Sequence, residues 1–180
     1  MNALFSLYNS IFERIERLLS PTVMPLLARL VFAGTLLIYF WNSAQTKLSG
    51  IFTLNFGAFA QIFPKKFEAL GYDPSLMSGL DRAIIFAGTY AEFILPAMIV
   101  LGLLTRIAAI GMIGFIVVQS VTDIVGHGAD AKTIGAWFDA ASDSHIMDQR
   151  AFWVFLLLYL MVRGAGAISL DRLFLDRARA

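Results

Sequence analysis

Four stretches of the chain are long enough and apolar enough to cross a lipid bilayer as helices. They cover approximately residues 23–41, 82–104, 107–125 and 151–168. A spanning helix needs roughly 20 mostly apolar residues, and helices are required because backbone amides in hydrocarbon have no water to bond. The stretches are apolar all round, and only 15% of residues are charged, which is too few to cover them in a soluble protein. The sequence therefore predicts an all-α fold, a four-transmembrane-helix bundle forming a single membrane domain over 1–180.

Two further segments have the pattern of helices that lie on the membrane surface. In residues 1–22, apolar side chains recur at helical spacing while most charged side chains lie elsewhere around the helix. This pattern predicts an N-terminal interfacial amphipathic helix rather than a signal peptide. Pro21 and Pro25 are expected to turn the chain into the first span. The Phe-rich stretch 56–70, which holds Lys65 and Lys66, predicts a second interfacial helix on the opposite face.

The distribution of basic residues favours an orientation with both chain ends in the cytoplasm. Arginines near the N-terminus, in the turn between spans two and three and in the C-terminal tail all fall on one side: Arg14, Arg17, Arg106, Arg163, Arg172, Arg177 and Arg179. The opposite side has fewer basic residues over two longer connections. We therefore expect a multi-pass membrane protein, in contact with the lipid bilayer, whose two ends lie in the cytoplasm. The net charge of +1 is too small to indicate a nucleic-acid partner.

The composition excludes several kinds of chemistry. The chain has no cysteine, so it can form no disulfide, thiolate nucleophile, iron–sulfur cluster or c-type haem. Its two histidines, His127 and His145, both lie in one polar connection, which argues against a haem held between two helices. The P-loop, GxSxG, HExxH and dinucleotide-binding motifs are missing too. If the protein handles electrons, it must use an organic carrier such as a quinone, or a partner subunit.

Glu92 is the most conspicuous polar residue inside a predicted span. An ionisable group there costs at least about 2.5–3.5 kcal/mol, which makes a functional role the first hypothesis. Pro96, four residues later, has no N–H, so the Glu92 carbonyl loses its helical partner. Glu92 could be a proton or ligand site, or a structural glutamate bonded to another helix. Arg29 in span one could extend to the membrane surface or reach Glu92, and Gln119 in span three is a third candidate.

A second group of polar residues follows the end of span three. Gln119, Asp123 and His127 are spaced four apart and so share one helical face. Asp123 and His127 could share a divalent metal or relay a proton. They could instead form a polar entrance for a quinone or another substrate, or belong to a solvated acidic connection with a helix cap. The sequence leaves these alternatives open.

Three segments resemble those of a known family. Span one with its continuation reads LLARLVFAGTLLIYFWNSAQTKL, span two with the turn after it reads AEFILPAMIVLGLLTRIAAIGM, and the chain ends with RGAGAISLDRLF. The residues that carry the match are Arg29, Gly34, Lys47, Glu92, Gly102, Arg106, Gly164, Gly166, Ser169, Leu170 and Asp171. In their order and spacing, from Pro25 onward, these segments resemble the DoxX family of small bacterial four-helix integral membrane proteins. The longer first outer connection and the acidic second one depart from the family pattern.

The resemblance implies a four-helix membrane bundle and leaves three hypotheses for the function. Some relatives are membrane subunits linked to thiosulfate–quinone oxidoreduction, so the chain could be a non-catalytic subunit or anchor of a quinone-linked redox system. Glu92, Arg29 and Gln119 would then contact the quinone. Other relatives lie beside metal-handling peptide systems, which suggests a non-enzymatic transport or metal-handling component with Asp123 and His127 at its outer mouth. The third hypothesis is a scaffold for a partner protein.

Overall fold

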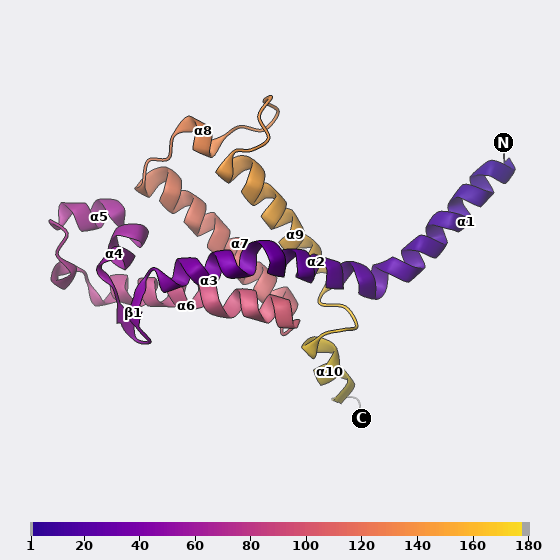
Figure 1. The fold of residues 1–180 in the computed structure, drawn as a ribbon, viewed down its shortest axis with the longest axis horizontal. Helices are drawn as coiled ribbons and strands as arrows, with labels where there is room; N and C mark the ends of the chain where they lie inside the picture. Colours follow the sequence, from indigo (N-terminus) through magenta and orange to yellow (C-terminus); the bar gives the residue numbers. More distant parts are fainter. Residues whose placement is uncertain (1, 178–180) are drawn as a thin grey trace.

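The protein consists almost entirely of helices. A computed structural model describes residues 2–177. Among them, four helical segments are long and apolar enough to cross a membrane: Met24–Gln45, Gly79–Leu101, Thr105–Gly126 and His145–Arg163. Figure 1 shows them as a bundle whose longer connections lie at one end. The predicted all-α, four-span architecture is confirmed.

Three of the four spans contain a π-helical turn next to an α-helix. Span two is the single α-helix α6. Span one combines α2 (Met24–Phe32), η2 (Ala33–Leu37) and α3 (Ile38–Gln45). Span three combines α7 (Thr105–Val121) and η4 (Thr122–Gly126). Span four combines η5 (His145–Gln149) and α9 (Arg150–Arg163).

The bounds of span four differ most from the prediction of 151–168. The helix begins at His145 because the Ser144 hydroxyl accepts a hydrogen bond from the Asp148 N–H, while the Asp148 carboxylate accepts one from the Ser144 N–H. It ends at Arg163 because Gly164 has a φ of +74°, which breaks the helix. Hydropathy alone misses both features, since the first turn is polar and the segment after the helix is apolar.

The N-terminal segment is helical, as predicted. Helix α1 (Asn2–Leu18) continues through the π-helical turn η1 (Leu19–Val23) into α2. Figure 1 shows α1 leaving the bundle at an angle to α2. The change of direction therefore occurs within a continuous helical path and not at a break in the helix. Apolar side chains of α1 such as Leu4 and Leu18 are exposed, which suits a helix in contact with lipid.

The connection between spans one and two folds into a compact unit, which we call the loop cap (residues 46–78). It comprises the hairpin β1 (Leu48–Gly50) and β2 (Thr53–Leu54), the helices α4 (Phe56–Ile62) and α5 (Pro64–Ala69), and the turn η3 (Pro74–Leu76). The predicted single helix over 56–70 is thus two helices, because Phe63 leaves the helical region before Pro64. Phe59 and Phe67 of the cap are buried with Ile85 of α6, so the cap rests on the first turns of span two.

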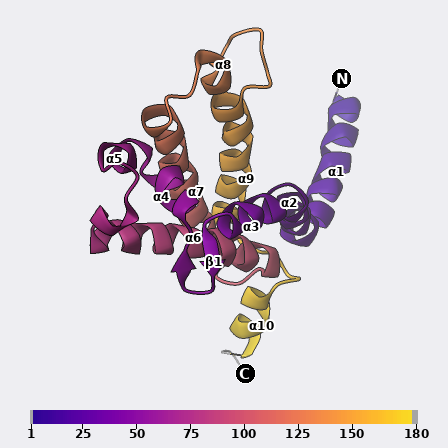
Figure 2. The ribbon, with the colours of Figure 1, turned by 60° about the vertical axis from the view of Figure 1, so that its left-hand side comes forward.

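The loop cap and the short helix α8 (Ala131–Ile134) lie at one end of the bundle, which we call the loop face. The opposite end, the terminal face, carries the turn between α6 and α7 and the segment after α9. Figure 2 shows α7 and α9 side by side, with α2 and α3 crossing them. This arrangement puts the two ends of span one at opposite faces of the protein.

The core among the spans is built on a regular spacing in span one. Ala28, Phe32, Leu36 and Phe40 are four residues apart, and all are buried. In an ideal α-helix a spacing of four drifts around the axis, because one turn takes 3.6 residues. The wider turn η2 lies within this stretch and offsets the drift. Small residues of α7, Ala108 and Ala109, pack against this core.

The segment 164–169 after α9 leads into the helix α10 (Leu170–Arg177) and folds back against the turn between α6 and α7. The Asp171 carboxylate accepts hydrogen bonds from the N–H groups of Leu104 (2.6 Å) and Thr105 (3.0 Å), at the start of α7. The Asp171 N–H donates to the Gly102 carbonyl at 2.7 Å. The terminal face is thus held by a short segment that bonds to the α6–α7 turn.

Replacing Gly102 by alanine is expected to destabilise the protein. Gly102 has a φ of +70°, and an added Cβ would lie 2.6 Å from Ser169 Cβ and 2.9 Å from Arg29 Cζ. The left-handed backbone and the overlap together predict a loss of roughly 2–4 kcal/mol, measurable as a lower free energy of unfolding in detergent. Gly114→Ala is the matched control, since its Cβ would meet nothing within 4 Å. Equal stability of the two variants would contradict this account of the turn.

Candidate functional site

A buried ion pair joins span two to the end of span one. Lys47 Nζ lies 2.8 Å from one Glu92 carboxylate oxygen and 3.1 Å from the other, and both side chains are only 4% exposed. The Ser43 hydroxyl donates to Glu92 at 3.0 Å. Lys47 Nζ also donates to the Ser43 hydroxyl and to the Ser43 carbonyl. All three ammonium protons and the carboxylate therefore have partners, as a buried charge requires.

The local fold of the chain after span one places Lys47. Helix α3 ends at Gln45, and the backbone then turns, with the Lys47 N–H donating to the Ala44 carbonyl. The Asn55 N–H donates to the Lys47 carbonyl, which fixes the backbone at the start of the hairpin. The long side chain can then reach back along α3 to Ser43. This explains how a residue outside the helix can neutralise an acid within span two.

Glu92 lies opposite the end of span one and not opposite its middle. Counted along α6 alone, Glu92 is about halfway. The earlier turns of α6, however, extend past span one and carry the loop cap through Ile85. Close by, the Trp41 indole N–H donates to the Phe93 carbonyl at 3.1 Å. The ion pair is thus enclosed between span one, span two and the underside of the loop cap.

Arg29 does not meet Glu92, nor does it extend to the surface, so neither of its two predicted positions is correct. Its guanidinium is buried and donates to four backbone carbonyls: Ile99 at 3.0 Å, Val100 at 2.6 Å, Ala165 at 3.2 Å and Ile168 at 2.5 Å. Ile99 is seven residues beyond Glu92 on α6, which corresponds to about 10 Å of helix rise. Arg29 instead donates to two carbonyls in the last turn of α6, and one of them, that of Ile99, also accepts the Gly102 N–H.

Gln119 also lies apart from the ion pair. Its side-chain nitrogen lies 3.0 Å from the Tyr39 hydroxyl, which joins span three to span one. The Tyr39 ring packs against Trp153 with 5.4 Å between the ring centroids. The side-chain oxygen of Gln119 has no hydrogen-bond partner among the described residues. The structure therefore does not bring Glu92, Arg29 and Gln119 into one site.

Asp123 and His127 follow one another along span three but bond to different elements. Asp123 forms an ion pair of 2.5 Å with Arg150 at the start of α9, and Arg150 also donates to Ser120. His127 Nε2 lies 3.0 Å from the Gln61 carbonyl of α4. The two side chains thus connect span three to span four and to the loop cap, respectively.

The acidic connection after span three is organised as helix caps. The Asp130 carboxylate accepts a hydrogen bond from the Thr133 N–H at the start of α8, and this bond holds the pKa of Asp130 below its usual range. Among the residues that the structure describes, no three His, Asp or Glu side chains gather as a metal ion would require. The interpretation as an acidic connection with a helix cap fits this geometry best.

Sequence reasoning found Glu92 but missed its two partners, Lys47 and Ser43. Lys47 lies beyond the apolar stretch of span one, so the sequence links it to the family resemblance and to the outer connections but not to Glu92. The polar run from Asn42 to Lys47, directly after the predicted end of span one, was the signal that could have found them. A buried carboxylate needs a basic or donor partner, and this run holds the first lysine of the chain.

The comparison with protein families agrees with the fold. The family model described as DoxX matches residues 24–122, more than half of the chain, from the start of span one to the end of span three. The protein belongs to the DoxX family. The region matched by the DoxX model contains Arg29, Ser43, Lys47 and Glu92, and it ends before span four. Comparisons with curated proteins and with solved structures gave no match.

Removing only the lysine of the ion pair is expected to be more harmful than removing both partners. Lys47→Met leaves a buried, unpaired carboxylate and should lower the free energy of unfolding by roughly 3–5 kcal/mol. The double variant Lys47→Met, Glu92→Leu should recover much of that loss. Denaturation in detergent of the wild type, both single variants and the double variant measures the coupling.

The pair between Lys66 and Asp81 is the matched control for this cycle. It has a similar distance of 2.7 Å, but the Lys66 side chain is 50% exposed. Because water screens an exposed pair, Lys66→Met should cost far less than Lys47→Met. Equal losses in the two variants would contradict a buried, tightly coupled Lys47–Glu92 pair.

Proposed function

We propose that the protein is a membrane subunit of a quinone-linked redox system, with the Lys47–Glu92 pair as its proton-exchanging group. The observation that carries this proposal is the burial of an acid and a base in direct contact at the end of a span. Ionisable residues within spans are costly and commonly mark proton or ligand sites. Membership of the DoxX family supports the membrane part of the proposal, and the ion pair supports the chemistry.

The chemistry available to the chain explains why a partner is part of the proposal. Without cysteine, and with both histidines in a connection at the loop face, the chain offers few ligands for a redox metal. Electrons would therefore come from the substrate of a partner subunit. A quinone takes up two electrons and two protons to become a quinol. This protein would anchor the partner and help to deliver the protons.

The groups around the ion pair suit the carbonyl oxygens of a quinone. Lys47 and Ser43 are hydrogen-bond donors, and Glu92 can hold a proton that it releases to the reduced ring. Trp41 and Phe93 lie close along the chain to Ser43 and Glu92, and their ring centroids are 6.4 Å apart. The Lys47–Ser43 bonds would have to be exchanged for bonds to the quinone. Arg29 and Gln119 are no longer assigned to this site, because they bond elsewhere.

A scaffold function is the second candidate, and one observation favours it. Lys47, Ser43 and Glu92 satisfy one another fully, so the group can be explained as a structural connection between spans one and two. A scaffold would hold a partner protein at the folded loop cap without any chemistry of its own. The metal-handling alternative is less well supported, since Asp123 is paired with Arg150 and His127 with a backbone carbonyl.

Glu92→Gln separates the redox proposal from the scaffold. In a complex isolated through this chain from native membranes, we expect quinone reduction per complex to be lost, because an amide cannot exchange the proton. Asp81→Asn on the same helix is the matched control and should keep full turnover. Unchanged turnover per complex in Glu92→Gln, with only the yield of complex reduced, would favour the scaffold. A chain that purifies without a partner would contradict both proposals.

We also propose that the terminal face is cytoplasmic and that the membrane is the bacterial inner membrane, on the basis of the arginine distribution. The absence of cysteine allows a direct test. Ala140 in the second outer connection and Ala167 near the C-terminus are both exposed. In spheroplasts, an impermeant maleimide should label Ala140→Cys, and should label Ala167→Cys only after the membrane is opened. The reverse pattern would invert the orientation.

A further inference from the structure

The terminal face holds a basic pocket that the proposed redox role does not use. It has a volume of about 930 Å³ and lies between the turn after α6, the first turn of α7, and the segment from the end of α9 into α10. Arg106, Arg163 and Arg172 line it, together with Asp171. The walls therefore carry more positive than negative charge.

The acid in this pocket is already engaged by the protein. The Asp171 carboxylate accepts the N–H groups of Leu104 and Thr105, so it serves to cap α7. Arg106, which follows Thr105, is exposed. Its side chain lies over Gly164, since a Cβ added to Gly164 would be 3.4 Å from Arg106 Nε. The pocket thus presents a guanidinium beside the first turn of α7, whose N-terminal N–H groups are already capped by Asp171.

A second, independent observation also points to a ligand. Thr105 lines the pocket and is fully buried, and its hydroxyl has no hydrogen-bond partner among the described residues. Thr35 and Thr89 lie within helices and donate to the carbonyl four residues earlier, but Thr105 is the first residue of α7 and has no such carbonyl in its own helix. A buried hydroxyl without a partner is costly, and an oxygen of a bound group would remove that cost.

The walls of the pocket are held in place without a ligand. Arg29 fixes the segment 164–169 by donating hydrogen bonds to the carbonyls of Ala165 and Ile168. The Ser169 hydroxyl donates to the Gly166 carbonyl at 2.7 Å. A site built in this way loses little conformational freedom when it binds.

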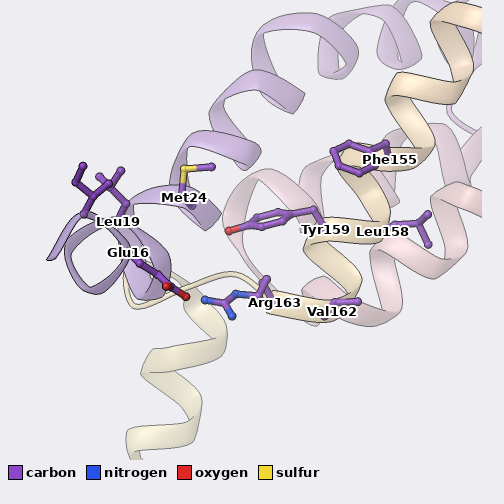
Figure 3. Close-up of a pocket in the computed structure, with 9 residues that line it drawn as sticks. Glu16, Leu19, Met24, Phe155, Leu158, Tyr159, Val162 and Arg163 are labelled. Atoms are coloured by element: carbon purple, nitrogen blue, oxygen red, sulfur yellow. The ribbon is translucent and has the colours of Figure 1, made fainter. Parts of the chain in front are cut away.

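An apolar groove adjoins the basic pocket. A second pocket of about 540 Å³ lies between the end of α1, the start of α2 and the outer side of α9, and it shares Arg163 with the first. Figure 3 shows Tyr159 of α9 extending toward Met24 and Leu19, with Arg163 at one end, whereas Leu158 points to the other side of α9. The Arg163 guanidinium points toward the Glu16 carboxylate. Even with Glu16 counted, the combined site keeps a positive excess.

We propose that the basic pocket binds the phosphate of an anionic phospholipid, whose acyl chain lies in the adjoining groove. Guanidinium groups and a hydroxyl suit phosphate oxygens, and basic pockets between spans are typical sites for anionic headgroups. The apolar groove that begins at Arg163 favours a lipid over a soluble phosphate. This proposal uses no residue of the Lys47–Glu92 site and stands independently of the redox role.

Native mass spectrometry of the full chain in detergent tests the proposal. Phosphatidylglycerol and phosphatidylcholine with identical acyl chains are the probes, and inorganic phosphate is the soluble competitor. We expect phosphatidylglycerol to bind at least about fivefold more tightly than phosphatidylcholine. Arg106→Gln should reduce that preference several-fold, whereas the matched control Arg14→Gln, an exposed arginine of α1 outside both pockets, should leave it unchanged.

Thr105 provides a separate readout, because its hydroxyl would contact the phosphate that both lipids share. Thr105→Val should weaken both lipids several-fold without changing the preference, and Thr105→Ser should restore binding. If Thr105→Val does not fold, the change in lipid preference of the exposed variant Arg106→Gln still tests the proposal. Equal binding of the two lipids, equal losses in Arg106→Gln and Arg14→Gln, or displacement of lipid by inorganic phosphate would each overturn the proposal.

Discussion

In hydrocarbon a polar group can form hydrogen bonds only with other groups of the protein. Two basic residues, Arg29 in span one and Lys47 just after it, provide such bonds to polar groups at the two ends of the bundle. Arg29 supplies donors to carbonyls at the end of span two and in the segment after span four. Lys47 neutralises the carboxylate of Glu92 near the opposite face. Span one is therefore attached to span two at both of its ends, by a cation bonded to backbone at the terminal face and by an ion pair at the loop face.

The two attachments differ in what they leave available for function. Arg29 bonds to backbone carbonyls, which cannot exchange protons, so its role is to position the terminal segment and with it the basic pocket. Lys47 and Glu92 are both titratable and could exchange a proton with each other or with a bound group. In the functions that we propose, the redox chemistry lies toward the loop face and lipid binding lies at the terminal face.

The sequence predicted the fold well because hydropathy and length decide whether a segment crosses a membrane. It also identified Glu92, since a carboxylate in an apolar helix is conspicuous. It could not identify the partners of Glu92 and Arg29. Lys47 lies past the apolar stretch that defines the span, and backbone carbonyls have no signature in a sequence. The rotation of each helix, which decides that Gln119 meets Tyr39 and not Glu92, depends on packing between segments distant in the chain.

The bonds of Arg29 also bear on how the protein is made. During synthesis, span one emerges from the ribosome long before the partners of Arg29 at Ala165 and Ile168, which lie 136 and 139 residues further along the chain. Until then its guanidinium must remain at the membrane surface or in water, so the first span enters the bilayer with a charge that lacks its final partners. The segment 164–169 completes this buried site. Membrane insertion of the first span and closure of the terminal face are thus separate events in time, and the second must wait until the segment after span four has been made.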